Sequence, residues 1–407
     1  MNKKRMWLCV IILVLCSIFT VRAEVAEGND SKEVYTEGIH LEAEDTEGEL
    51  ESLYTQWQEK FMGELEFDEI QQMLDEELGK DSFSIWETLK SVMKGELPFS
   101  KETVQELLYS LFFSQLNEER GLILKIILLV LFAAIFHVFT DVFEDGQIGT
   151  ISFYIVYLLM FIFLADNFAE MSRELEAKLS WFSEFMKGLT PAYYMTVAAS
   201  SGVTTAAVFY QGILLLLMVI QWGLKSVVLP CANLYILLMF VNHLSKEEMV
   251  NKLADLLYSL IGWILKTFMG VVVGLQVVQG LVTPVVDSLK RGLLGKTASM
   301  IPGIGSAVNT VTELMLTGAV LIRNSLGVVV LLILVIVGAK PMIHYVFMSL
   351  VYRLLAAIAE PVSDKRIVAC LSTMGEGCML LFRIVFHAEF LCVVTFLILM
   401  MSFGGRV

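Results

Sequence analysis

Residues 314–339 read LMLTGAVLIRNSLGVVVLLILVIVGA, and this stretch decides the fold class. It contains one ionisable side chain, Arg323, among mainly apolar residues. A helix needs about 20 predominantly apolar residues to cross a hydrocarbon layer roughly 30 Å thick. The sequence therefore predicts a membrane-spanning helix at this position.

Seven further stretches have similar length and composition, which predicts an all-α polytopic membrane protein with about eight spans. The chain has 407 residues, of which 56% are hydrophobic and 18% are charged. Soluble globular chains are about 45–50% apolar and about 25% charged, so the composition excludes an ordinary soluble enzyme, a disordered chain and a nucleic-acid binder. The predicted spans are 122–140, 149–168, 203–222, 227–243, 256–282, 314–339, 342–360 and 377–403.

The formal net charge of −14 is distributed unevenly along the chain. Residues 1–23 carry four Lys or Arg and no acid, and the next segment, 24–119, has 26 Asp or Glu against six Lys or Arg. The basic start, a short apolar run and small residues before Ala23 are typical of a secretory signal peptide cleaved after Ala23. An uncleaved anchor helix is the alternative. Either reading places residues 24–120 outside the cytoplasm, ahead of a membrane domain at 121–407.

The exported acidic segment is predicted to be partly helical. Residues 24–49 are rich in acids and poor in apolar residues, which predicts disorder. From about residue 50, apolar side chains recur at helical spacing in four short stretches, with Gly79 and Gly95 as stops and Ser100 as a cap. We interpret the segment as a docking surface for a partner, and a solvated polar face is the alternative.

The membrane domain contains a possible internal repeat. Pro191 and Pro302 lie 111 residues apart, as do Pro230 and Pro341. Pro191 begins a small-residue stretch, TPAYYMTVAASSGVTTAA, that is typical of a broken or re-entrant helix. Pro302 stands in an equivalent stretch with Gly303 and Gly305. Units at about 190–282 and 301–403 with three spans each would be inverted relative to one another, as in many transporters.

Ionisable side chains within the apolar stretches are candidate functional residues, because a charge at membrane depth is costly. Arg323 is the first candidate for a transport or gating role, and Glu389 is its candidate partner. Pro191, Pro302, Gly303 and Gly305 are candidate structural positions of the broken helices. The weaker candidates, some of which can extend to the membrane surface, are Lys125, Lys266, Arg353, Arg383, His137, His344 and His387.

The chain lacks the common catalytic and metal-binding motifs. It has no HExxH, no P-loop and no GxSxG sequence, and the six cysteines show neither a disulfide framework nor zinc spacing. Ser201, with His243 and His387 in other spans, leaves an intramembrane serine protease as a remote alternative. The sequence therefore predicts a protein that is not an enzyme and holds no cofactor.

Three motifs resemble the stage III sporulation protein AE family. They are IPGIGSAV at 301–308, AVLIRNSLG at 319–327 and AEPVSDKRIV at 359–368, the last followed by LSTMG. A looser resemblance covers nearly the whole chain.

The resemblance implies an endospore-forming bacterium and a location in the mother-cell membrane around the forespore, with the acidic segment facing the space between the two membranes. It also implies a subunit of the channel complex between the cells, needed for forespore integrity and late forespore gene expression. The implied partners are the other stage III A proteins and a forespore membrane protein. The family supplies no catalytic residues. A stand-alone secondary transporter for a small solute is the alternative function.

Overall fold

The computed structural model describes residues 67–79, 83–95, 119–135, 146–201, 215–244, 250–298, 305–361 and 363–403, with isolated positions 56, 60, 61, 63, 65 and 212. Every element in this part of the chain is helical. Five of these helices are long and apolar enough to cross a membrane, so the all-α membrane class is confirmed. The elements are α3 Asp68–Leu78, α4 Ile85–Met93, helix 119–135, α6 Gly146–Gly188, α7 Thr190–Ser201, η1 Leu224–Val228, α9 Leu229–Leu244, α10 Asn251–Ala298, α11 Gly305–Ala359 and α12 Lys365–Phe403.

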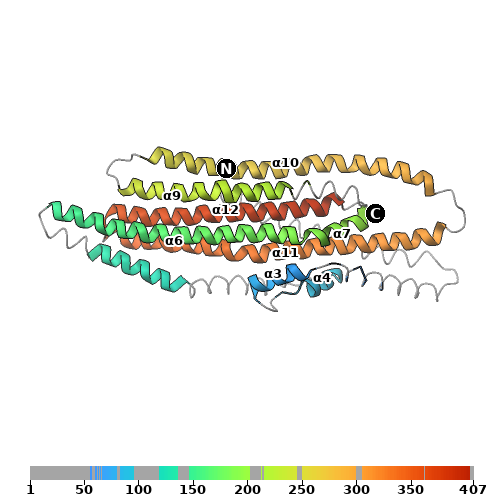
Figure 1. Ribbon diagram of the computed structural model, residues 1–407, viewed down its shortest axis with the longest axis horizontal. Coiled ribbons are helices and arrows are strands. Elements are labelled where there is room, and N and C mark those ends of the chain that lie inside the picture. The colour runs from blue at the N-terminus through green and yellow to red at the C-terminus, as the bar shows by residue number, and fades with distance from the viewer. Residues whose placement is uncertain are drawn as a thin grey trace.

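The long helices lie side by side in an elongated bundle (Figure 1). α9 and α10 form one hairpin, and α11 and α12 form another. Both hairpins turn at the same end, because His243 Nε2 near the end of α9 lies 2.9 Å from Thr373 Oγ1 near the start of α12. Tyr157 on α6 joins the same end by donating a 2.6 Å hydrogen bond to the Phe240 carbonyl.

The structure differs from the predicted eight spans at two places. Residues 215–222, the continuously described part of the stretch 203–222, share helix Leu215–Leu244 with the stretch 227–243, and the stretches 314–339 and 342–360 share α11. The predicted boundaries between these spans lie near Pro230 and Pro341, but each proline removes only one backbone donor and its helix continues. A π-helical turn, η1, precedes Pro230, and such turns accommodate irregularities within an α-helix.

The continuous helices also bear on the predicted repeat. In the described structure the first unit contains α7, helix Leu215–Leu244 and the first part of α10, and the second contains α11 and α12. The α9–α10 and α11–α12 hairpins turn at the same end, and the inverted relation of the two units stays a prediction. The boundaries of the repeat units, at about 190–282 and 301–403, stay a prediction.

The helix formed by α6 is interrupted where the small-residue stretch begins. α6 ends at Gly188 and α7 begins at Thr190, with Pro191 as its second residue. Proline is favoured in the first turn of a helix, where its missing N–H costs little. Backbone hydrogen bonds from Leu189 to Phe185 and from Tyr193 to Leu189 carry the chain across the break.

Helices α3 and α4 of the acidic segment are joined by one side chain. Gln71 donates from Nε2 to the Phe83 carbonyl at 2.7 Å, and its Oε1 accepts from the Ile85 N–H at 3.0 Å. Gly79 ends α3 with φ of 96°, as the sequence predicted, because this left-handed conformation favours glycine. The signal peptide at 1–23 and its Ala23 site, the segment 24–49 and the Ser100 cap lie outside the described residues.

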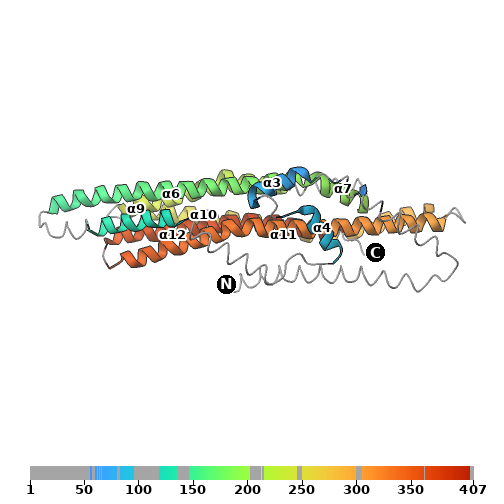
Figure 2. The ribbon, with the colours of Figure 1, turned by 90° about the horizontal axis from the view of Figure 1, so that it is seen from below.

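These two helices pack on the membrane bundle rather than standing apart from it. Figure 2 shows α3 beside α6 and α4 beside α11. Ile70 lies under Gly188 of α6, and Glu77 forms an ion pair with Lys178 of the same helix. The buried faces of α3 and α4 belong to the same apolar core as the bundle. The acidic segment is therefore attached to the membrane domain through its apolar face.

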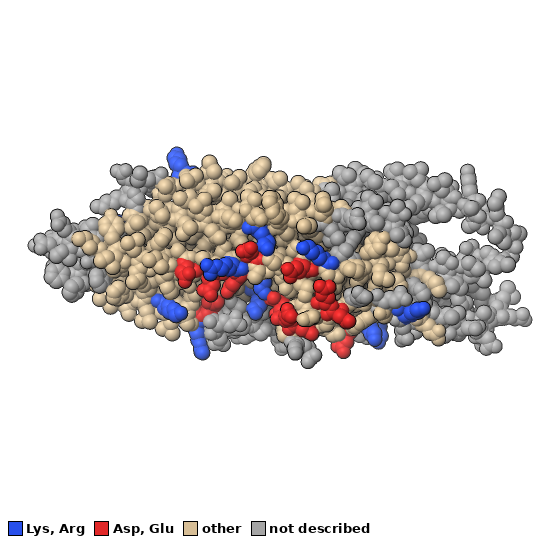
Figure 3. Space-filling model, in the orientation of Figure 1, with Lys and Arg blue, Asp and Glu red and all other residues tan. Residues whose placement is uncertain are grey.

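The bundle surface has an apolar and a charged part. Near the hairpin turns α11 exposes Val346, Leu350, Leu354 and Ile358, one on each turn of the helix, and such a stripe suits contact with lipid. Charged side chains gather over the middle of the face seen in Figure 3. In the second half of α6 the exposed charged residues are Asp166, Glu170, Arg173, Glu174, Glu176, Glu184 and Lys187.

The hydrogen bond of Tyr157 is expected to stabilise the junction of α6, α9 and α12. Its buried hydroxyl also lies 2.9 Å from Cys370 Sγ. Tyr157→Phe removes both contacts, so we expect a loss of about 0.5–1.5 kcal/mol, measured as a lower thermal unfolding midpoint in detergent. Tyr352→Phe is the matched control: the Tyr352 hydroxyl is buried without a hydrogen-bond partner among the described residues, so its removal should leave the midpoint equal or higher. Equal effects of the two substitutions would contradict this assignment.

Candidate functional site

Arg323 lies about a third of the way along α11 and has no exposed surface. Its Nε and Nη2 donate to Asn324 Oδ1 at 3.4 and 3.2 Å. The neighbouring residues Ile322 and Leu326 are also fully buried. The guanidinium is thus enclosed by protein, and a buried cation is retained only where surrounding polar groups compensate for its lost hydration.

Glu389 lies on α12, where it is 6% exposed. Its carboxyl group rests on Gly338 of α11, so closely that a Cβ at Gly338 would lie 1.9 Å from Glu389 Oε2. Within the described part of the chain, Glu389 Oε2 is buried without a hydrogen-bond partner. The residue therefore places a carboxyl group in the apolar contact between two long helices.

The predicted pairing of Arg323 with Glu389 does not occur in the described structure. Glu389 rests on Gly338, which is fifteen residues beyond Arg323 on α11. At 1.5 Å per residue the two sites are about 22 Å apart along the helix. Arg323 and Glu389 are therefore two separate buried groups on the same pair of helices.

Two other glycines allow close packing on α12. A Cβ at Gly375 would lie 2.8 Å from Arg353 Cγ, and one at Gly377 would lie 2.8 Å from both Ile236 Cδ1 and Phe168 Cε2. Ser349 Oγ also donates to the Gly375 carbonyl at 2.7 Å. Small residues at such contacts let helix backbones approach closely. Near its N-terminal end α12 is therefore held tightly by α6, α9 and α11.

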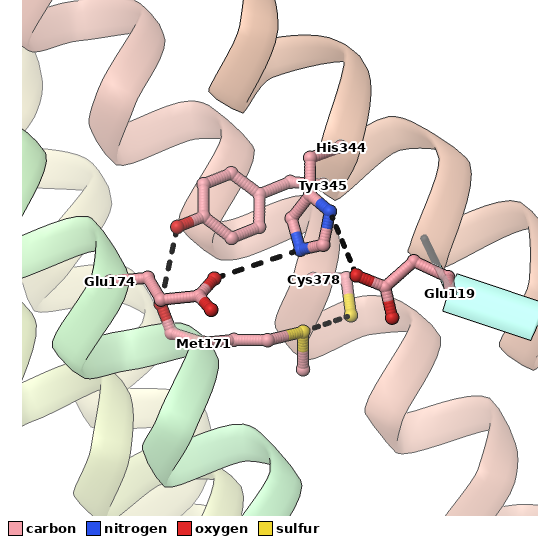
Figure 4. Close-up of polar contacts among 6 residues, drawn as sticks. All are labelled: Glu119, Met171, Glu174, His344, Tyr345 and Cys378. Atoms are coloured by element: carbon pink, nitrogen blue, oxygen red, sulfur yellow. Dashed lines mark hydrogen bonds and ion pairs between the residues drawn. The ribbon is translucent and has the colours of Figure 1, made fainter. Parts of the chain in front are cut away.

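A polar cluster centred on His344 joins three helices (Figure 4). His344 Nδ1 lies 3.6 Å from Glu119 Oε1 of helix 119–135, and its Nε2 lies 4.0 Å from Glu174 Oε2 of α6. The adjacent Tyr345 donates to the Met171 carbonyl at 3.1 Å. His344, a weak candidate from sequence, thus connects the end of the acidic segment to α6 and α11.

A cavity of about 300 Å³ lies beside α12, between the end of α6 and helix Leu215–Leu244. Most of its lining is apolar, but Gln221, Lys187 and Cys392 also reach it. Gln221 Nε2 lies 3.6 Å from Cys392 Sγ, while Gln221 Oε1 is buried and has no hydrogen-bond partner among the residues that the structure describes. Cys392 is three residues from Glu389, so the cavity approaches the Glu389 site.

The remaining candidate residues are less informative. Pro191 is exposed in the first turn of α7, and Gly305 is the first residue of α11. Pro302 and Gly303 lie outside the described residues. Within the described chain, no group of three or more His, Cys, Asp or Glu residues could hold a metal ion.

The two histidines considered for a protease have other partners. His243 contacts Thr373, and His387 Nδ1 lies 2.6 Å from the Arg383 carbonyl. Both ring contacts join neighbouring turns or helices. They give His243 and His387 structural roles and offer no support for a serine protease.

Sequence reasoning identified Arg323 and Glu389 but did not find the groups around them. Gly338 is 51 residues before Glu389, and Glu119 is 225 residues before His344, so local spacing carries no signal for either contact. Gly338 is the next-to-last residue of the predicted span 314–339, which places it near the end of a helix in the sequence prediction. Only the fold shows that it is an interior contact.

Comparisons with known proteins agree with the sequence motifs. A family model described as stage III sporulation protein AE matches residues 83–403. A curated relative, stage III sporulation protein AE of Bacillus subtilis (strain 168), is 24% identical over 296 residues, which cover 72% of this chain and 74% of the relative. No solved structure matches the chain.

Proposed function

This chain belongs to the stage III sporulation protein AE family, and from that premise we propose that it is a membrane subunit of the channel complex between mother cell and forespore. Membership confirms the resemblance seen in the motifs and gives the chain a role in sporulation. The long apolar helices make it a membrane protein. The finer assignment concerns which complex it enters and what it contributes there.

The observation that carries the proposal is the attachment of the acidic helices to the membrane bundle. The chain combines a lipid-facing stripe on α11 with a polar layer formed by α3 and α4. Their buried faces contact the bundle, while the acids Asp68, Glu69 and Glu76 of α3 remain exposed. An anchored acidic surface of this kind suits contact with basic partners.

The proposal places the chain in the mother-cell membrane around the forespore. Its acidic segment would face the space between the two membranes, where it would meet the forespore membrane partner. The other stage III A proteins would bind it within or beside the mother-cell membrane. In this position the subunit would support forespore integrity and late forespore gene expression.

Co-purification from sporulating cells tests this assignment. The tagged chain, extracted from membranes in mild detergent, is expected to bring down other stage III A proteins, identified by mass spectrometry. A strain with the same tag on an unrelated polytopic membrane protein serves as the control. Recovery of the chain alone would contradict the complex. A purified chain that by itself moves a small solute into liposomes would favour the alternative of a stand-alone transporter.

Charge reversal on α3 is expected to weaken partner binding. Changing Asp68, Glu69 and Glu76 together to lysine replaces the attraction for a basic partner by repulsion, so recovery of the bound proteins should fall severalfold. The measurement is the ratio of co-purified protein to bait. Glu360→Lys, an exposed acid in the turn between α11 and α12, is the matched control and should leave the ratio unchanged. An unchanged ratio for the triple variant would remove α3 from the proposed interface.

A further inference from the structure

We propose that Glu389 is a proton-binding site in the contact between α11 and α12. The carboxyl group is more than nine-tenths buried, it makes no hydrogen bond or ion pair with any described residue, and it lies directly against Gly338. These three observations point to a neutral carboxylic acid. The proposal goes beyond complex membership and does not depend on it.

The surroundings of Glu389 favour a proton over a permanent charge. An ionised carboxylate buried without a partner loses its hydration and gains little in return. The main compensations are a cation, hydrogen-bond donors or a proton. In the described structure the carboxyl group contacts Gly338, which has no side chain that could supply a cation or a hydrogen-bond donor. Binding a proton neutralises the group and allows the observed contact.

Gly338 makes the contact depend on the state of the carboxyl group. With a neutral acid, α11 and α12 can approach until the carboxyl group touches the glycine backbone. A negatively charged group would instead move toward water or donors, which requires the helices to separate or the side chain to leave the contact. Loss of the proton would therefore loosen this part of the α11–α12 hairpin.

The neighbouring cavity offers a direction from which a proton can arrive. Cys392 is on the same helix as Glu389 and one turn further along, and it lines the cavity together with Gln221. The buried Gln221 Oε1 has no hydrogen-bond partner in the described structure and can accept a hydrogen bond from a water molecule. A water molecule between the cavity and the carboxyl group would have Gln221 as a hydrogen-bond partner.

Other ionisable side chains lie on the helices packed around this region. None of them makes a hydrogen bond or ion pair with Glu389, and Lys225 is already bonded to Ser180 Oγ at 2.8 Å. They are His387, Cys392 and Arg383 on α12, Lys340 on α11, Lys187 on α6, Lys225 on η1 and Lys266 on α10.

A hydrophobic carbodiimide tests the proposal on the full chain in native membranes. Dicyclohexylcarbodiimide enters apolar regions and reacts with protonated carboxyl groups. The acid proton moves to a carbodiimide nitrogen, the carboxyl oxygen bonds to the central carbon, and an acyl shift from oxygen to nitrogen leaves a stable acylurea. The reaction is an addition and needs no oxidant, reductant or leaving group.

We expect peptide mass spectrometry to find the added carbodiimide on Glu389 at neutral pH. Glu376, an exposed acid on the same helix, is the matched internal control and should remain unlabelled. Labelling should disappear in Glu389→Gln. An unlabelled Glu389 in folded membranes, together with labelling after denaturation in acid, would overturn the proposal. Protection of Glu389 by sodium ions at constant pH would also overturn it, because it would identify a metal cation as the ligand.

Infrared difference spectroscopy gives a second measurement that does not depend on access of a reagent. The purified chain should show the C=O band of a protonated carboxylic acid, which shifts in heavy water and is lost in Glu389→Gln. The control variant Glu376→Gln should keep the band. If the band is absent from the folded chain, or is unaffected by Glu389→Gln, Glu389 does not hold the proton.

Discussion

Gly338→Ala is expected to push α11 and α12 apart and to destabilise the folded chain by about 1–3 kcal/mol, the usual cost of overpacking a core. The reason is geometric. The new Cβ would lie 1.9 Å from Oε2 and 2.1 Å from Cδ of Glu389, so the carboxyl group must leave its place. Because Glu389 is only 6% exposed, this movement also disturbs the apolar side chains around it.

The measurement is the thermal unfolding midpoint of the purified variant in detergent. Gly262→Ala and Gly270→Ala in α10 are matched controls, because an added Cβ at either glycine meets nothing within 4 Å. Alanine has the higher helix propensity, so these controls should equal the unchanged chain or exceed it in stability. Gly338→Ala with a midpoint as high as the controls would show that the contact with Glu389 is not tight.

A double-mutant cycle separates the contact from general damage. Glu389→Ala removes the carboxyl group and opens space beside Gly338. The combination with Gly338→Ala should therefore be less destabilised than the sum of the two single substitutions. Coupling energies between residues in contact reach 0.5–3 kcal/mol. Additive losses would mean that Gly338 and Glu389 act independently.

The apolar stretches in the sequence predicted the fold class correctly because burial in lipid or protein requires long runs without charge. Local signals were also reliable: Gly79 ends α3, and α7 begins at Thr190–Pro191. Both features depend on the backbone of a few adjacent residues. Such local requirements are visible in the sequence before any tertiary contact is known.

The span boundaries predicted near Pro230 and Pro341 were wrong, because whether a helix continues through such a position depends on contacts with residues distant in the sequence. Lys225 lies close to Pro230 in the predicted gap between the spans 203–222 and 227–243, and its Nζ donates to Ser180 Oγ at 2.8 Å and lies 3.9 Å from Glu176 Oε1. These partners on α6 allow a charged residue to stay in a continuous helix. The sequence around residue 225 does not indicate these partners on α6.

The candidate site was also predictable only in part, because its contacts depend on residues distant in the sequence. A lone Arg or Glu in an apolar stretch stands out by residue type, which is why Arg323 and Glu389 were found. The partners of a buried group are set by how the helices pack. Only the structure could therefore show that Arg323 and the Gly338 contact of Glu389 lie apart along α11. The same holds for the contacts of Glu119 and Glu174 with His344.

Arg323→Leu is expected to abolish sporulation while the protein remains in the membrane. Replacing a buried charged group by an apolar side chain of similar size is often neutral or stabilising for folding, so a structural role alone predicts normal protein levels and normal spores. A role in transport or gating predicts normal protein levels together with a block in sporulation, because the guanidinium and its hydrogen-bond donors are lost. The measurements are the count of heat-resistant spores and the amount of chain in washed membranes.

Two further variants decide what Arg323 contributes. Arg323→Lys keeps the positive charge but loses the planar group that reaches Asn324 through both Nε and Nη2. It should restore sporulation in part if the charge matters and not at all if the planar geometry is required. Ile322→Leu, a volume-conserving change at the fully buried neighbouring position, should sporulate normally. Normal spores from Arg323→Leu would leave the arginine without a functional role, and loss of the protein from the membrane would instead make it a requirement for folding.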